Sequence, residues 1–112
     1  MNNRQIITLM HKLFRDDIDK SDGYVHLFTN DELDVSKYNA FVSSYIQDEN
    51  ILVYVNSQNV HYCSIKESFE LVRKNMSNSR IRLANESFSA KILIESMGVG
   101  VGHLTRRSTR TP

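Results

Sequence analysis

His61 and Cys63 are the two residues of this chain whose types and spacing best fit nucleophilic chemistry. They lie two positions apart in a segment rich in β-branched and aromatic residues, so a strand would place both side chains on one face of a sheet. An imidazole beside a thiol favours the thiolate nucleophile. The sequence identifies no third residue to orient the pair, and cysteine is usually a small buried hydrophobe. A small enzyme with a Cys/His site is therefore a second alternative rather than the favoured interpretation.

The acidic segment 17–28 resembles a calcium-binding loop only in part. Asp17, Asp19 and Ser21 match the first three alternate ligands of an EF-hand loop. The sixth position, which requires glycine, is Asp22, and the twelfth, which requires a bidentate glutamate, is Phe28. A solvated acidic turn is the better interpretation. A zinc site that combines the Cys/His pair with His26 or His103 matches no known ligand spacing either. We expect no bound metal.

Gly98, Gly100 and Gly102 superficially resemble a phosphate-binding loop. A dinucleotide fingerprint follows a strand and opens a helix, and little chain remains after Gly102 to form one. The glycines instead indicate close approach of backbones, or a bulge, in an edge strand. The chain has no other recognisable phosphate-binding or hydrolase motif. We therefore expect no cofactor.

Aromatic and basic residues support nucleic-acid binding as the first alternative. RNA recognition modules stack bases on aromatic side chains of a sheet, and arginines contact phosphates. The segment 60–65 lacks the aromatic, glycine-containing signature of those modules, and the net charge is only +1. The residues that would act are the strand aromatics Tyr24, Phe28, Tyr54 and Tyr62, together with Arg80, Arg82, Arg106, Arg107 and Arg110.

Charge is unevenly distributed along the chain. Residues 1–50 hold five Lys/Arg against nine Asp/Glu, whereas residues 51–112 hold nine against four. The densest acidic stretch, 16–34, contains Lys20 as its one basic residue. An acidic surface would attract a basic protein partner and steer its approach. The predicted partner-binding residues are Asp16, Asp17, Asp19, Asp22, Asp31, Glu32 and Asp34.

The segment 51–65 predicts the hairpin around which the fold is built. Residues 51–55 form an unbroken apolar run, which is typical of a strand buried on both faces, and we expect it to be the central strand. A polar connector, 56–59, joins it to a second strand over 60–65. Both strands contain residues of the Cys/His and aromatic candidates, so this hairpin would position them.

The other elements follow from periodicity and capping signals. Helices are expected over 3–15, 35–47 and 65–76, the second with a capping box at Thr29–Glu32 and the third with one at Ser64–Glu67. Strands are expected over 24–28, 80–84 and 99–105. Residues 88–97 are ambiguous between helix and strand, and a period of two favours a strand. The remaining residues, 106–112, would form a flexible basic tail.

These elements predict one α+β domain over 1–105, with a mostly antiparallel sheet and helices on one face. The order from 24 to 84 is β-α-β-β-α-β, the order of a ferredoxin-like core, here with an extra N-terminal helix and a C-terminal hairpin. No apolar run is long enough to cross a membrane, and the single cysteine fits a reducing compartment, so a cytoplasmic location is expected. We favour a small, non-enzymatic interaction protein of the inhibitor, immunity or regulatory kind. Its oligomeric state is not predicted.

Overall fold

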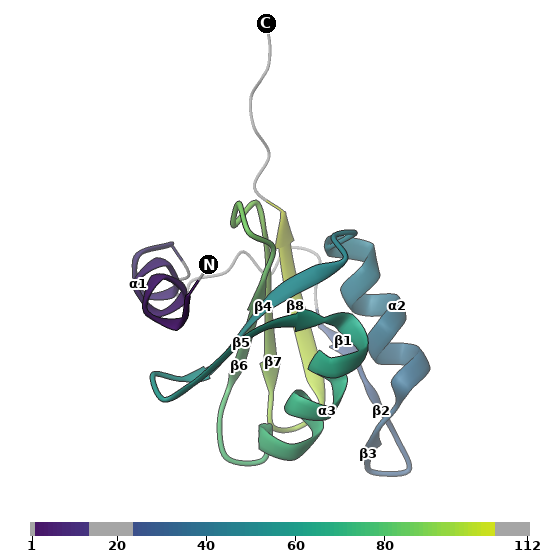
Figure 1. Cartoon of the computed structure of the whole chain (residues 1–112). Coiled ribbons are helices and arrows are strands. Elements are labelled where there is room, and N and C mark those ends of the chain that lie inside the picture. The colour runs from purple at the N-terminus through teal and green to yellow at the C-terminus, as the bar shows by residue number, and fades with distance from the viewer. Residues whose placement is uncertain (1, 14–23, 105–112) are drawn as a thin grey trace, which may run out of the picture.

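The computed structural model describes residues 2–13 and 24–104 as an α+β fold (Figure 1). The predicted tail and the acids before residue 24 lie outside the described residues. The elements, in chain order, are α1 (Asn3–Leu13), β1 (Val25–His26), β2 (Phe28–Thr29), β3 (Glu32–Leu33), α2 (Val35–Tyr45), β4 (Asn50–Asn56), β5 (Asn59–Ser64), α3 (Ile65–Asn75), β6 (Ile81–Ala84), β7 (Ala90–Glu95) and β8 (Val99–Leu104).

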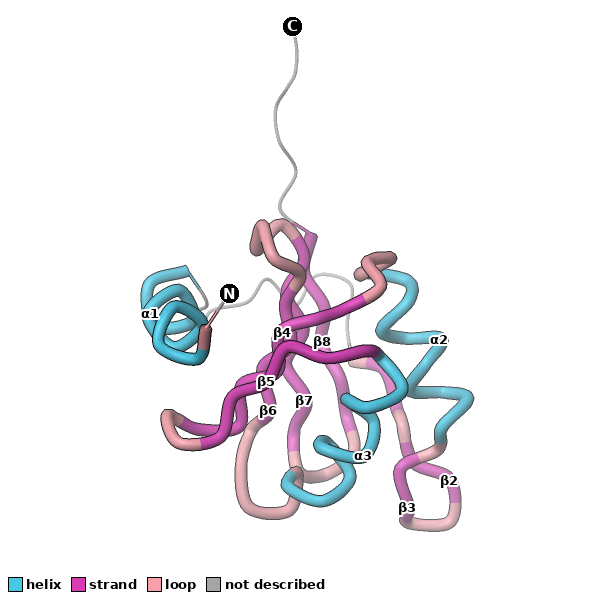
Figure 2. The backbone as a smooth tube through the Cα atoms, viewed as in Figure 1, coloured by secondary structure: helices cyan, strands magenta, loops and turns pink. Residues whose placement is uncertain are grey.

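One antiparallel sheet of six strands, in the order β1-β8-β7-β6-β4-β5, forms the centre of the described part (Figure 2). The predicted hairpin is confirmed as β4 and β5. Strand β4 lies between β5 and β6, and Leu52 and Val53 are fully buried on its opposite faces. The run has no polar alternation because both of its faces are covered. It is an interior strand, one place from the sheet edge.

Helices cover both faces of this sheet (Figure 1). The two helices of the expected β-α-β-β-α-β order, α2 and α3, share one face and cover the larger apolar cluster. The additional N-terminal helix α1 covers the other face, where Ile6 and Met10 pack against Leu52, Leu93 and Val101. The chain order of a ferredoxin-like core is present, but the observed order of strands in the sheet does not confirm such a core.

The two helices on the larger face begin at side-chain caps. The capping box at the start of α3 is confirmed, because the Ser64 hydroxyl accepts the Glu67 N–H while the Glu67 carboxylate accepts the Ser64 N–H. The capping box predicted at Thr29–Glu32 is wrong. Asp34 is the N-cap of α2, and its carboxylate accepts the Lys37 N–H at 3.0 Å.

The segment predicted as one strand over 24–28 is divided in the structure. Residues Val25–His26 pair with β8, and after the buried Leu27 the chain enters a separate hairpin, β2–β3. Asn30 and Asp31, between these short strands, have φ angles of 53° and 64°. Two positive φ angles define a type I′ turn, which Asn and Asp tolerate better than other non-glycine residues. The preference of Asn30 and Asp31 for a turn, and not a helix cap, therefore explains the conformation of residues 29–32.

Residues 90–95 form strand β7, which resolves the ambiguity of 88–97 in favour of a strand, and β8 follows as predicted. However, β8 is an interior strand between β1 and β7. Its glycines receive aromatic rings of α2 rather than another backbone: a Cβ on Gly100 would lie 2.5 Å from the Phe41 ring, and one on Gly102 would overlap the Tyr45 ring. In the described residues, no helix has the length and apolar character that a membrane span requires.

Candidate partner-binding surface

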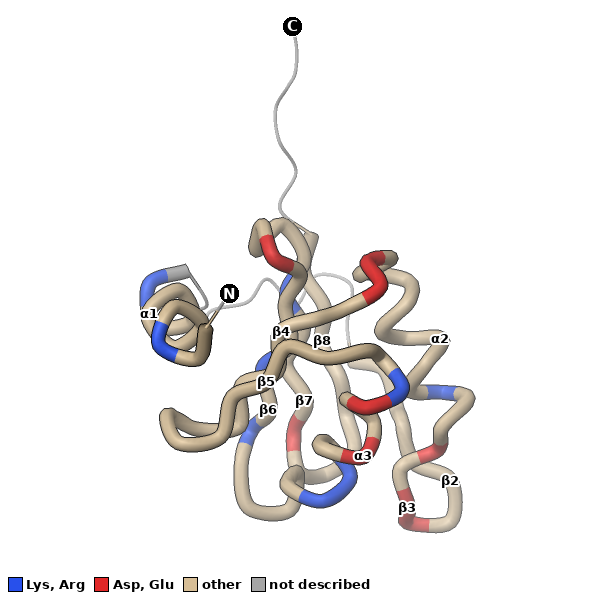
Figure 3. The backbone as a smooth tube through the Cα atoms, viewed as in Figure 1, with Lys and Arg blue, Asp and Glu red and all other residues tan. Residues whose placement is uncertain are grey.

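The β2–β3 hairpin projects from the main sheet and presents two of the predicted acids (Figure 3). Asp31 lies in its turn and Glu32 begins β3, and both side chains are exposed. Hydrogen bonds hold the base of the hairpin, because the Leu27 N–H donates to the Gly98 carbonyl at 2.8 Å and the Asp34 N–H donates to the Leu27 carbonyl at 2.8 Å. The acids are thus displayed on a fixed support.

Asp34 has a structural role that the acidic pattern did not reveal. Hydrogen bonds to its carboxylate, chiefly from the Lys37 N–H and also from the Thr29 side chain, lower the pKa of Asp34. The Lys37 ammonium donates to the Phe28 carbonyl at 2.9 Å, which ties α2 to the hairpin. Asp34 therefore contributes to the support of the hairpin, whereas the side chains of Asp31 and Glu32 are exposed.

A groove of about 490 Å³ lies between this hairpin and the end of α3. Asp31 and Glu32 line one side of it, and Arg73 and Met76 line the other. The Arg73 guanidinium binds the Glu70 carboxylate at 2.6 Å. That contact raises the pKa of Arg73, and the nearby Glu32 charge adds to the effect. The surface therefore combines exposed acids with one arginine that is already paired.

Sequence patterns did not identify Lys37 or Arg73 as parts of this surface. Both are ordinary charged residues of amphipathic helices, and only the fold brings them beside the hairpin. The remaining predicted partner-binding residues, Asp16, Asp17, Asp19 and Asp22, lie outside the described residues.

No protein-family model matches this chain, and neither a curated protein nor a solved structure matches it.

The geometry does not favour His61 and Cys63 as a catalytic pair. Both line a cleft of about 330 Å³ beside α3, as their alternation on β5 predicts. The His61 ring is hydrogen-bonded to the Asn59 side chain. Burial, with a smaller contribution from the Glu67 charge, raises the pKa of Cys63 to about 11. A thiol in this environment remains protonated at neutral pH, whereas a nucleophilic cysteine requires a lowered pKa.

The histidines considered for zinc are separated by the sheet. His61 and Cys63 face α3, whereas the pairing of His26 with Val99 and of His103 with Lys91 places both of these histidines on the α1 face. Within residues 2–13 and 24–104, no group of three or more His, Cys, Asp or Glu side chains is arranged to hold a metal ion.

The strand aromatics considered for RNA binding do not share one open platform. Tyr54 is enclosed: its hydroxyl is 3.0 Å from the His11 ring nitrogen, and the Arg82 guanidinium lies 5.5 Å from its ring centroid. Phe28 packs on Gly98. The exposed rings of Tyr24 and Tyr62 lie at opposite edges of the sheet, beside β1 and on β5.

Of the arginines proposed to contact nucleic acid, Arg80 pairs with Glu95 at 2.8 Å. The Arg82 guanidinium packs over the Tyr54 ring. The other three, Arg106, Arg107 and Arg110, lie outside the described residues. The described geometry therefore supplies neither a stacking platform nor a basic stripe for this alternative.

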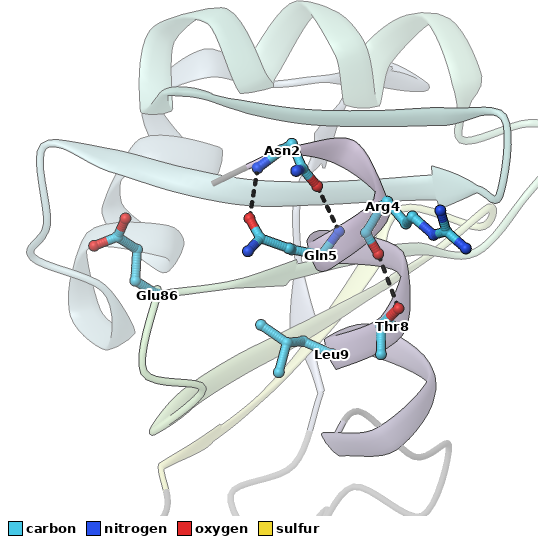
Figure 4. A pocket seen from close by; sticks show the side chains of 6 residues that line it. All are labelled: Asn2, Arg4, Gln5, Thr8, Leu9 and Glu86. Carbon is cyan, nitrogen blue, oxygen red and sulfur yellow. Dashed lines mark hydrogen bonds between the residues drawn. The ribbon is translucent and has the colours of Figure 1, made fainter.

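A larger groove, of about 750 Å³, lies beside α1, and Asn2, Gln5 and Thr8, which line it, form hydrogen bonds within the helix (Figure 4). Asn2 and Gln5 form a reciprocal cap, with N–H to side-chain oxygen distances of 3.0 and 2.9 Å. The Thr8 hydroxyl donates to the Arg4 carbonyl at 2.9 Å. The groove presents the start of a helix rather than converging ligand-binding groups.

Proposed function

We propose that this chain is a small non-enzymatic protein, of the inhibitor, immunity or regulatory kind, that binds a basic protein partner through an acidic surface. The observation that supports this most is the anchored β2–β3 hairpin, which presents Asp31 in its turn and Glu32 at the start of β3, both exposed. The lone Cys63 fits action in the reducing cytoplasm.

A fixed hairpin suits binding by surface complementarity. A preorganised loop loses less conformational entropy on association than a mobile one. Exposed acids at its tip would speed the approach of a basic partner and help select against acidic ones. Arg73, which lines the adjacent groove and is exposed, would then lie close to the bound partner.

The test is a charge-changing variant that preserves the turn. Asp31→Asn keeps a residue that tolerates a positive φ angle, and Glu32→Lys reverses the neighbouring charge. We expect this double variant to capture less partner from a native host extract than wild type does, by about tenfold at low salt, with a smaller difference at high salt. Affinity capture with mass spectrometry measures this.

The matched control is Asp48→Asn with Glu49→Lys, the same charge change in the exposed loop before β4. It should capture partner as wild type does. Equal capture by wild type and the hairpin variant would reject the acidic-surface proposal. Retention of wild type on RNA or DNA at low salt, with no protein captured, would support the nucleic-acid alternative instead.

A further inference from the structure

The two edges of the main sheet differ in their protection against pairing with another chain. The β1 edge contains two residues, Val25 and His26. The β5 edge contains six, Asn59–Ser64, and within residues 2–13 and 24–104 it pairs with β4 alone. Its sequence, NVHYCS, has no Lys, Arg, Asp, Glu or Pro. Proteins commonly protect edge strands by short length, charge, proline or a bulge. Strand β5 is not short, and it has neither a charged residue nor a proline.

A regular pairing register extends over most of this edge. From Ser64 to Val60 the partners on β4 follow one another without interruption, and the register shift lies only beyond Tyr54, at the hairpin end. The outer backbone groups of this segment can therefore accept another straight strand. Tyr62, near the middle of β5, is 40% exposed.

The α3 surface that lines the cleft along this edge is self-complementary in charge. The residues of α3 beside His61 and Cys63 are Glu67, Glu70, Leu71 and Lys74. Glu70 is paired with Arg73 on the same helix. Glu67, Leu71 and Lys74 are spaced four and three apart, so they form one stripe along the helix. The stripe has an acid at one end, an apolar residue at its middle and a base at the other end. Such a stripe complements an antiparallel copy of itself.

We infer that β5 is a dimerisation edge, and that its occupant is β5 of a second copy of this chain. Antiparallel pairing about a two-fold axis perpendicular to the sheet joins the two sheets into one of twelve strands, twice the six of one copy. The same axis places the two α3 helices side by side on one face. Leu71 then meets Leu71 of the second copy, and each Glu67 lies opposite a Lys74.

This inference goes beyond the proposed function and does not depend on it. The residues of the hairpin surface, Asp31 and Glu32, belong to neither β5 nor the α3 stripe. Changing them should leave dimerisation intact, so failure of one proposal is distinguishable from failure of the other.

Sedimentation analysis of the full chain over a concentration series tests the dimer. Wild type should convert from monomer to dimer as concentration rises. Tyr62→Lys places a charge of the kind that protects natural edge strands on an exposed position, and should abolish the dimer. Lys74→Glu should weaken dimerisation by about tenfold at low salt, because two favourable charge pairs become repulsive.

Lys66→Glu is the matched control, since it makes the same charge change on α3 at an exposed residue that does not line the cleft. It should dimerise like wild type. Circular dichroism establishes that each variant is folded. A wild type that stays monomeric at millimolar concentration overturns the inference, and so does a dimer that withstands both Tyr62→Lys and Lys74→Glu. A monomer that instead binds unrelated strand peptides also overturns it.

Discussion

The two faces of the main sheet are covered in different ways. On one face, α2 and α3 contact each other as well as the sheet: the Tyr38 hydroxyl lies 2.7 Å from the Ser68 hydroxyl, and the Tyr38 and Phe69 rings pack edge to face. On the other face, α1 is a single helix, which packs on the sheet through Ile6 and Met10.

This difference indicates unequal local stability. A helix pair loses contacts with the sheet and with its neighbouring helix when either member detaches, whereas the described contacts of α1 are mainly with the sheet. Regions with fewer buried contacts open at lower free energy than the rest of a native protein. We therefore expect α1 to open before α2, α3 or the strands between them.

We expect the largest effects on stability from substitution of one buried methionine on each face of the sheet, and the two variants can be compared directly. Met10 of α1 is fully buried, and Met76 at the end of α3 is 5% exposed. Each Met→Ala change should cost about 2–5 kcal/mol of packing free energy. In Met10→Ala, hydrogen exchange should accelerate mainly in α1, whereas Met76→Ala should lower the free energy of global unfolding. Equal loss of protection throughout the chain in both variants would show that the faces unfold together.

A substitution at Gly100 tests the close packing of α2 on β8. The Phe41 ring lies where a Cβ would project, and Phe41 is only 5% exposed, so it has little room to move. Gly100→Ala should lower the free energy of unfolding by about 1–3 kcal/mol, measured by denaturant titration. Gly102→Ala should cost less, because Tyr45 is only partly buried and its ring can shift outward. The opposite order would contradict this explanation.

The hydroxyl chain between α2 and α3 should have a smaller effect. Ser68 donates to the Ile65 carbonyl, so Tyr38 donates to Ser68. Ser68→Ala leaves the buried tyrosine hydroxyl without its acceptor and should cost about 1–3 kcal/mol, whereas Tyr38→Phe removes the donor and should cost about 1 kcal/mol. Thermal unfolding of the two variants measures the difference. Equal costs would mean that the Tyr38 hydroxyl finds another partner.

The two faces of β5 should differ in titration. Burial raises the pKa of Cys63 to about 11, so alkylation should remain slow until the pH approaches that value. The unfolded thiol ionises near about 8.5, so stability is fully present below that pH and falls as the pH rises toward 11. On the opposite face, a hydrogen bond with the Glu86 side chain is the largest of several causes that raise the pKa of Tyr62.

Glu86→Gln should therefore lower the pKa of Tyr62, followed by ultraviolet absorbance, and leave that of Cys63 unchanged. A Cys63 pKa near 8.5 would contradict its burial.

Local patterns predicted most of the elements correctly. Helices α1, α2 and α3, the β4–β5 hairpin and strands β6, β7 and β8 agree with their expected positions within a few residues. The chief error, at Thr29–Glu32, arose because a Thr-x-x-Glu pattern can fit a helix cap, whereas its two middle residues also suit a type I′ turn. Sequence spacing does not decide between them when a helix follows nearby.

The glycine pattern was also open to more than one explanation. Residues four apart on a helix are separated by about 6 Å, and residues two apart on a strand by nearly the same distance. Phe41 and Tyr45 on α2 therefore match Gly100 and Gly102 on β8. The sequence contains both spacings, but only the packing of α2 over β8 shows that they belong together.

The sequence by itself determined which segments are helices and strands, because periodicity, β-branched runs and caps are local properties. Tertiary structure alone decided which strands lie at the sheet edges, that α1 covers the face opposite α2 and α3, and that Asp34 caps a helix while Asp31 and Glu32 stand exposed. These features depend on contacts between segments far apart in the chain, which no local pattern specifies.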